Sequence, residues 1–172
     1  TFLRRGDFMN KTIRKIVFAG IIAALYVVLT LALAPISYGA IQFRISEILV
    51  LLAYFDPIYI GGLTLGCFIA NLLGPNGVWD IIFGTLATFI SLYAIYFTSK
   101  INIKEKYRLL IASIWPTVFN GAIIGIMLAY VLNIPILISI LEVAIGEFVV
   151  VTIVGVPIAC KLRDKIKKIK IV

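Results

Sequence analysis

The chain has 172 residues, of which 62% are hydrophobic and 14% are charged, and its mean hydropathy is +1.12. Soluble domains average about 45–50% apolar and about 25% charged residues, so this composition excludes an ordinary soluble domain and indicates an integral membrane protein. The net charge of +8 does not indicate nucleic-acid binding, because the basic residues form three clusters separated by apolar spans and no single basic face.

Six apolar segments predict an all-α bundle of six transmembrane helices, judged against a hydrocarbon layer of about 30 Å. In chain order these segments are residues 12–33, 46–55, 58–73, 78–98, 109–132 and 135–161. The second is short for a complete span, and the Asp56-Pro57 pair separates it from the third. The sequence therefore predicts a cytoplasmic N-terminal extension (residues 1–11), a membrane domain (12–161) and a basic cytoplasmic tail (162–172).

The basic residues predict the orientation of the bundle. All of the 16 except Arg44 lie before or in the first turn of the first predicted helix, between the fourth and the fifth, or from the last residue of the sixth onward. Lysine and arginine are enriched in cytoplasmic loops, and six helices place all three clusters on the same side. We therefore expect both termini in the cytoplasm, at the plasma membrane.

Acids and amides within the apolar spans are the first candidates for a binding site. Glu147 and Asn120 each lie about 18 Å from the outer ends of their helices, and Glu142 lies about 10 Å from the outer end. A carboxylate at this depth is costly and usually marks a substrate or ion path. Structural hydrogen bonds between helices remain the alternative interpretation for Glu147 and Asn120.

A second group of candidates lies around the predicted first outer loop. The loop contributes Gln42, Phe43 and Arg44, and the outer ends of the third and fourth helices contribute Asn71, Trp79 and Asp80. Simpler roles are open for several of them. Arg44 has the spacing of a helical ion pair with Glu47, Asp80 suits a helix N-terminus, and Trp79 suits the membrane interface. Together with the acids, these residues predict a polar cup open to the outside.

The first predicted helix carries small residues four apart near its cytoplasmic end, in the pairs Ala19/Ala23 and Gly20/Ala24. Such a face lets another helix approach closely. Packing within the chain and docking to a partner subunit are both compatible with it.

Several features of enzymes and motors are missing from the sequence. It has no histidine, no nucleotide-binding glycine loop, no metal-ligand spacing and no nucleophile–base arrangement. We therefore expect no enzyme activity, metal or cofactor, and predict a ligand-capturing subunit that depends on a separate motor. Two other classes stay open: a small membrane enzyme acting on lipids or isoprenoids, and a structural subunit without ligand.

Four stretches resemble the QueT family of queuosine-precursor transporters. They are ALYVVLTLALAPISYGAIQFRISEIL, GCFIANLLGPNGVWDIIFGTLAT, PTVFNGAIIG and GEFVVVTIVGVP. The resemblance implies a six-helix substrate-binding (S) component of an energy-coupling-factor (ECF) transporter. It also implies that the small-residue face of the first helix docks to a transmembrane coupling subunit, with two cytoplasmic ATPases as further partners.

The implied substrate is a 7-deazaguanine, either the aminomethyl or the cyano precursor of queuosine, held near the outer surface under the first loop. In this interpretation Glu147 or Glu142 accepts the N–H groups of the guanine-like edge, and Asn120 pairs with its carbonyl edge. The other carboxylate or Asp80 would pair with an aminomethyl cation, and Phe43, Tyr38 or Trp79 would stack on the ring. A different flat, vitamin-like heterocycle remains the alternative ligand.

Overall fold

The computed structural model describes residues 2–39 and 41–168, with side chains for residues 13–39 and 41–166. This described part is helical with connecting loops and contains no strand, which confirms the prediction of an all-α fold. Its elements are α1 (Phe2–Ala32), α2 (Ala34–Ser37), the 3₁₀ helix η1 (Ile45–Leu51), α3 (Leu52–Phe55), α4 (Ile58–Leu73), α5 (Gly77–Trp79), the π-helix η2 (Asp80–Gly84), α6 (Thr85–Thr98), α7 (Glu105–Leu132), α8 (Ile136–Glu147), the π-helix η3 (Phe148–Gly155) and α9 (Val156–Lys168).

Four helical stretches in the described part are long and apolar enough to cross a membrane. These are Ile13–Ala32, Gly77–Thr98, Glu105–Leu132 and Ile136–Ile166. The helices Ile45–Phe55 and Ile58–Leu73 are apolar but shorter. All six predicted segments are thus helical, and four of them have the length of a span.

Two predicted boundaries differ from the structure. Helix α1 begins at Phe2, so residues 2–11 of the predicted N-terminal extension continue the helix. Helix α9 runs to Lys168 and takes in most of the predicted tail, while residues 169–172 lie outside the described residues. No glycine or proline follows Pro157, so the sequence contains no strong helix breaker at the predicted boundary.

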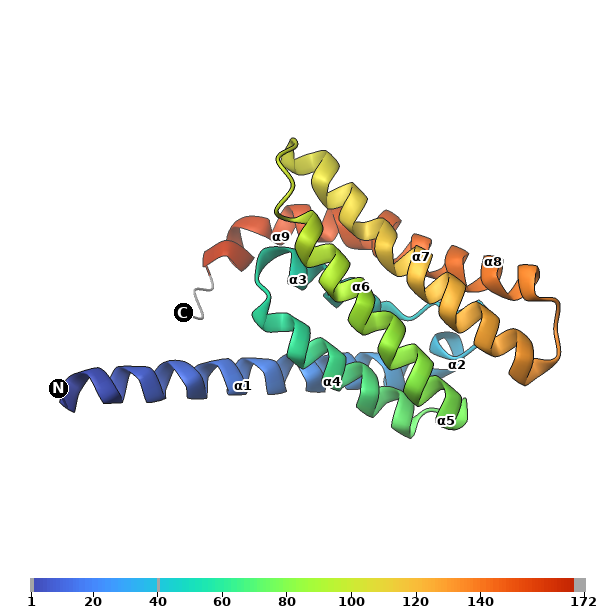
Figure 1. Cartoon of the computed structure of the whole chain (residues 1–172), viewed down its shortest axis with the longest axis horizontal. Helices are drawn as coiled ribbons and strands as arrows, with labels where there is room; N and C mark the ends of the chain where they lie inside the picture. Colours follow the sequence, from blue (N-terminus) through green and yellow to red (C-terminus); the bar gives the residue numbers. More distant parts are fainter. Residues whose placement is uncertain (1, 40, 169–172) are drawn as a thin grey trace.

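The two ends of the bundle differ in the elements they carry (Figure 1). The start of α1, the connection between α6 and α7, and α9 lie toward one end. Helices α2 and α5 and the connection between α7 and α8 lie toward the other. The three basic regions of the chain therefore share one end of the molecule.

Helices α1 and α4 pack closely because small residues face each other. A Cβ atom added to Gly62 would lie 2.6 Å from the Ala19 carbonyl oxygen, and one added to Gly66 would lie 2.9 Å from the Ala23 carbonyl oxygen. The other two small residues of α1, Gly20 and Ala24, are exposed. Half of the predicted small-residue face is therefore occupied within the chain, by a matching pair of glycines on α4.

Replacing Gly66 by valine should lower the stability of the protein by about 1–3 kcal/mol, the usual cost of overpacking a close contact. The added atoms meet the α1 backbone, which cannot move aside as a flexible side chain would. Thermal unfolding in detergent measures the change. Gly61→Ala is the control, since nothing lies within 4 Å of its added Cβ. Equal stability of Gly66→Val and wild type would contradict this packing.

The largest apolar core lies among α1, η1, α4, α6 and η3 and includes Tyr26, Leu51, Leu63, Leu92 and Val151. Helices α7 and α8 are held together separately. A Cβ added to Gly121 would lie 3.0 Å from the Ala144 side chain, and one added to Gly125 would lie 2.6 Å from Ile140 Cα. This close approach brings the middle of α7 against the end of α8.

Candidate binding site

Four charged side chains are buried in the described part of the chain: Arg44, Glu47, Asp80 and Glu147. They come from the connection before η1, from η1 itself, from the first residue of η2 and from the last residue of α8. Burying charge costs free energy unless it is paired or hydrogen-bonded. These four residues and their polar neighbours form what we call the buried polar cluster.

The connection between α2 and η1 lies directly against the end of α8. A Cβ atom added to Gly146 would lie 2.5 Å from the Gln42 carbonyl oxygen, so only glycine allows the two backbones to approach this closely. The connection is closed on itself by a hydrogen bond in which the Phe43 amide donates to the Ile36 carbonyl at 3.0 Å. The Gln42 backbone therefore lies against Gly146, the residue that precedes Glu147.

Arg44 is only 2% exposed and pairs with Asp80, with 3.6 Å between the Arg44 Nη2 and Asp80 Oδ2 atoms. Its guanidinium also lies 5.3 Å from the centroid of the Tyr38 ring, and the Tyr38 hydroxyl donates to the Ala70 carbonyl at 2.6 Å. The ion-pair contact of Arg44 is thus made with Asp80, while Arg44 and Glu47 interact electrostatically without such a contact. The ion pair joins the α2–η1 connection to η2.

Asp80 is further held by two asparagines. Asn71 Nδ2 donates to the Asp80 carbonyl at 3.1 Å, and Asn76 Nδ2 donates to the Asp80 carboxylate at 3.4 Å. A Cβ atom added to Gly84 would lie 2.6 Å from Asp80 Oδ1, so this glycine leaves the space that the carboxylate fills. The π-helix that begins at Asp80 is a type of distortion frequent at functional sites.

Glu47 is the one of the four buried charged residues that the sequence did not predict to contact the ligand. Its carboxylate accepts a hydrogen bond from the Tyr26 hydroxyl and a longer one, at 3.5 Å, from the Thr88 hydroxyl. Beside it, the hydroxyl oxygens of Thr30 and Ser46 lie 2.6 Å apart. These bonds tie α1, η1 and α6 together around one acid. An acid within an apolar segment is the available signal for Glu47, although its spacing from Arg44 is equally typical of a helical ion pair.

Glu147 and Asn120 meet as their predicted depths require, with Asn120 Nδ2 donating to Glu147 Oε1 at 2.7 Å. Glu147 also interacts electrostatically with Glu47 and with Arg44. The acid at the end of α8 therefore belongs to the same cluster as the residues of η1 and the α2–η1 connection.

Many polar atoms of this cluster have no hydrogen-bond partner among the described residues. They are Ser37 Oγ, Gln42 Nε2, Arg44 Nε and Nη2, Glu47 Oε2, Asn71 Oδ1, Asp80 Oδ1, Asn120 Oδ1 and Glu147 Oε2. Buried polar groups are nearly always hydrogen-bonded, and leaving one unpaired costs about 1–3 kcal/mol. Such a concentration of free donors and acceptors suits a polar ligand that completes their hydrogen bonds.

Three of the predicted site residues contribute no atom to this set of unpaired polar atoms. Phe43 is half-buried and packs against the apolar core, and Glu142 is half-buried one turn and a half from Glu147. Trp79 is 56% exposed. The structure thus brings together Gln42, Arg44, Asn71, Asp80, Asn120 and Glu147 from the prediction, and adds Glu47 and Tyr26.

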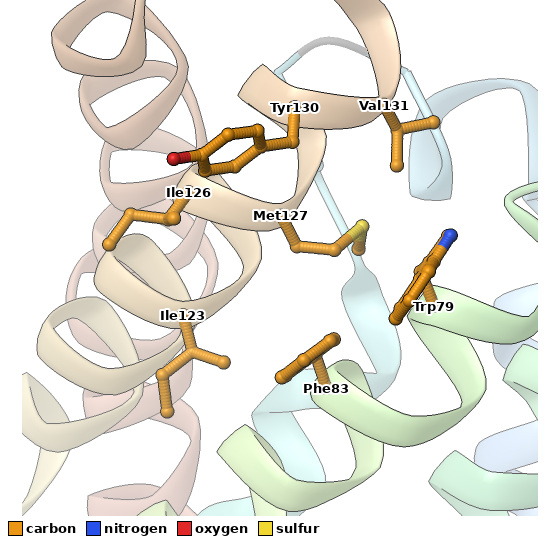
Figure 2. A pocket seen from close by; sticks show the side chains of 7 residues that line it. All are labelled: Trp79, Phe83, Ile123, Ile126, Met127, Tyr130 and Val131. Carbon is orange, nitrogen blue, oxygen red and sulfur yellow. The ribbon is translucent and has the colours of Figure 1, made fainter.

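Trp79 instead lines an apolar pocket of ≈ 620 Å³ between η2 and the end of α7. Figure 2 shows its side chain and that of Phe83 on one side, facing Met127 and its neighbours on α7. The two rings stack at 6.0 Å between centroids. The lining residues are Trp79, Phe83, Ile123, Ile126, Met127, Tyr130 and Val131, none of which belongs to the buried polar cluster.

The described residues contain no group of three or more histidine, cysteine, aspartate or glutamate side chains placed to hold a metal ion.

Comparison with known proteins agrees with the resemblance found in the sequence. A family model described as "QueT transporter" matches residues 16–164. The chain is 38% identical over 150 residues to the "Queuosine precursor transporter QueT" of Lactococcus lactis subsp. cremoris (strain MG1363), an alignment that covers 77% of this chain and 83% of that protein. No solved structure matches significantly.

Proposed function

The chain belongs to the QueT transporter family and is a multi-pass membrane protein, and on this premise we propose that it is the S component of an ECF transporter. In this role it captures a queuosine precursor, a 7-deazaguanine, from outside the cell and delivers it for ATP-driven uptake. The observation that carries the proposal is the set of free, buried donors and acceptors between the α2–η1 connection and α8.

We further propose that six helices cross the membrane, with residues 12–161 as the membrane domain and both termini in the cytoplasm. The short helices Ile45–Phe55 and Ile58–Leu73 then complete the four long spans. The three basic regions lie toward one end of the molecule, which suits the cytoplasmic side. The α2–η1 connection and the buried polar cluster beneath it then face the outer half of the membrane.

The free atoms suggest how a deazaguanine is held. Glu147 Oε2 is free to accept from the N–H groups of the guanine-like edge. Because Asn120 Nδ2 already donates to Glu147, its free atom is an acceptor, which suits an exocyclic amine better than the carbonyl expected from the sequence. The donors for the ligand carbonyl are then Gln42 Nε2 and the Arg44 guanidinium.

The proposed partners are a transmembrane coupling subunit and two cytoplasmic ATPases. The sequence itself has no nucleotide-binding glycine loop, so energy must come from another protein. Gly20 and Ala24 remain exposed on α1, whereas Ala19 and Ala23 pack against α4. We therefore place the docking face on Gly20 and Ala24, where a small-residue surface admits a neighbouring helix.

A deazaguanine should raise the thermal stability of the purified protein in detergent. A ligand present at about 100 times its dissociation constant stabilises the folded state by about 2.7 kcal/mol. The measurement is a thermal-shift screen against 7-aminomethyl- and 7-cyano-7-deazaguanine, guanine and water-soluble vitamins. Stabilisation by a vitamin and by no deazaguanine would assign the site to another heterocycle, and no stabilisation by any compound would contradict the proposed function.

A further inference from the structure

The buried polar cluster contains more negative than positive groups. Among the described residues, its buried charged side chains are three acids, Glu47, Asp80 and Glu147, and one base, Arg44. The base lies 3.6 Å from Asp80, so these two charges balance each other. Arg44 also interacts electrostatically with Glu47 and Glu147, but one base cannot balance three acids, and the direct hydrogen bonds of Glu47 and Glu147 are to uncharged groups.

Those contacts leave one oxygen of each acid available. Glu47 Oε1 accepts from Tyr26 and Thr88, and Glu147 Oε1 accepts from Asn120. The second oxygen of each, Oε2, is buried without a hydrogen bond. The two carboxylates are also near enough to interact electrostatically. Two buried acids in this arrangement need either a bound proton or a cation to balance their charge.

We propose that Glu47 binds a cationic substituent of the ligand and makes the site selective for 7-aminomethyl-7-deazaguanine over the uncharged cyano compound. This inference rests on the proposed function. Glu147 takes the N–H edge of the ring, as described above, and Glu47 takes the protonated amine. The assignment replaces Glu142 and Asp80 in this role, because Asp80 is paired with Arg44 and Glu142 is only half-buried and contributes no unpaired polar atom.

The two ligands separate the effect of charge from that of shape. Both carry the same deazaguanine ring and differ at one substituent, an aminomethyl group with three N–H donors and a positive charge, or a nitrile with neither. A buried carboxylate gains a charge-assisted hydrogen bond only from the first. The nitrile nitrogen of the cyano compound is a hydrogen-bond acceptor, as is the Glu47 carboxylate, so Glu47 Oε2 stays unpaired.

Calorimetric titration of the detergent-solubilised protein with each compound tests the proposal. Wild type should bind the aminomethyl compound about tenfold or more tightly than the cyano compound, as expected for one charge-assisted hydrogen bond. In Glu47→Gln this preference should fall to about threefold or less, mainly through weaker binding of the aminomethyl compound. Glutamine keeps the side-chain shape and can still accept from Tyr26.

Two further results separate selectivity from a structural role. Glu142→Gln removes an acid that contributes no unpaired polar atom to the cluster, and it should keep the wild-type ratio of the two affinities. Equal binding of both compounds by wild type, or an equal loss of both in Glu47→Gln, would overturn the proposal and leave the proposed function standing. Failure of wild type to bind either compound would overturn both.

Discussion

Replacing Glu147 by glutamine should weaken deazaguanine binding by about 30-fold or more, since truncating one partner of a buried, hydrogen-bonded charge typically costs about 2–5 kcal/mol. Glutamine offers an amide where the carboxylate Oε2 is free to accept, so one N–H group of the ligand meets a weaker acceptor or a donor. Asn120 can still donate to the remaining oxygen, so the protein should fold. Calorimetry with 7-aminomethyl-7-deazaguanine measures the change.

Glu142→Gln is the matched control, because it changes an acid on the same helix that is only half-buried. Its effect on affinity should stay within about threefold, in the range of surface substitutions. Wild-type affinity in Glu147→Gln would remove Glu147 from the site. An equal loss in both variants would show that the net charge of α8 matters and not the position of one carboxylate.

Replacing Arg44 by methionine should lower the stability of the ligand-free protein by about 3–5 kcal/mol. Methionine has a similar length but leaves Asp80 as a buried acid without its cation. The stacking of the guanidinium over Tyr38 is also lost, which loosens the α2–η1 connection. Thermal unfolding in detergent without ligand measures the effect.

The double variant Arg44→Met/Asp80→Asn separates the ion pair from other roles of the arginine. If the cost arises from the unpaired acid, removing that charge should restore more than half of the lost stability. Asparagine can keep the contacts to Asn76 because its amide offers both a donor and an acceptor. A double variant no more stable than Arg44→Met would show that the arginine stabilises the protein through other contacts.

The contact between Asn120 and Glu147 could be predicted from the sequence because helical rise alone places both at the same distance from their helix ends. Counting residues from the outer helix ends brought Asn120 and Glu147 to one level, and the two are hydrogen-bonded at 2.7 Å. The helical segments followed from length and hydropathy in the same way. The helical segments and the position of a residue along its helix could therefore be predicted without knowing how the helices pack.

The partners of Arg44 and Glu47 could not be predicted, because they depend on how separate helices pack. Their spacing fits a helical pair only if both lie on one helix, and the backbone of Arg44 is extended (φ −84°, ψ 91°). Glu47 instead meets Tyr26 and Thr88, which lie 21 and 41 residues away in the chain. A pattern of neighbouring residues in the sequence therefore cannot predict these hydrogen bonds.

The sequence also did not identify which helix packs against the small residues of α1. Ala19 and Ala23 pack against Gly62 and Gly66, a second pair of small residues four apart. A small-residue stripe predicts that some helix approaches closely, but it does not identify which. Recognising that α4 carries a complementary stripe would have assigned these alanines to the interior of the chain.

The contact between Gly146 and the Gln42 carbonyl has a consequence for how a solute enters. Because the free polar atoms are buried, a solute reaches them only if a covering segment moves, and in the proposed function this is the segment around Gln42. The contact between this segment and α8 is a van der Waals contact between the two backbones. The hydrogen bond from the Phe43 amide to the Ile36 carbonyl lies within the segment and need not break when it moves. The ion pair between Arg44 and Asp80 opposes this movement, and a bound ligand that contacts both Gln42 and Glu147 would oppose it further and slow its own release.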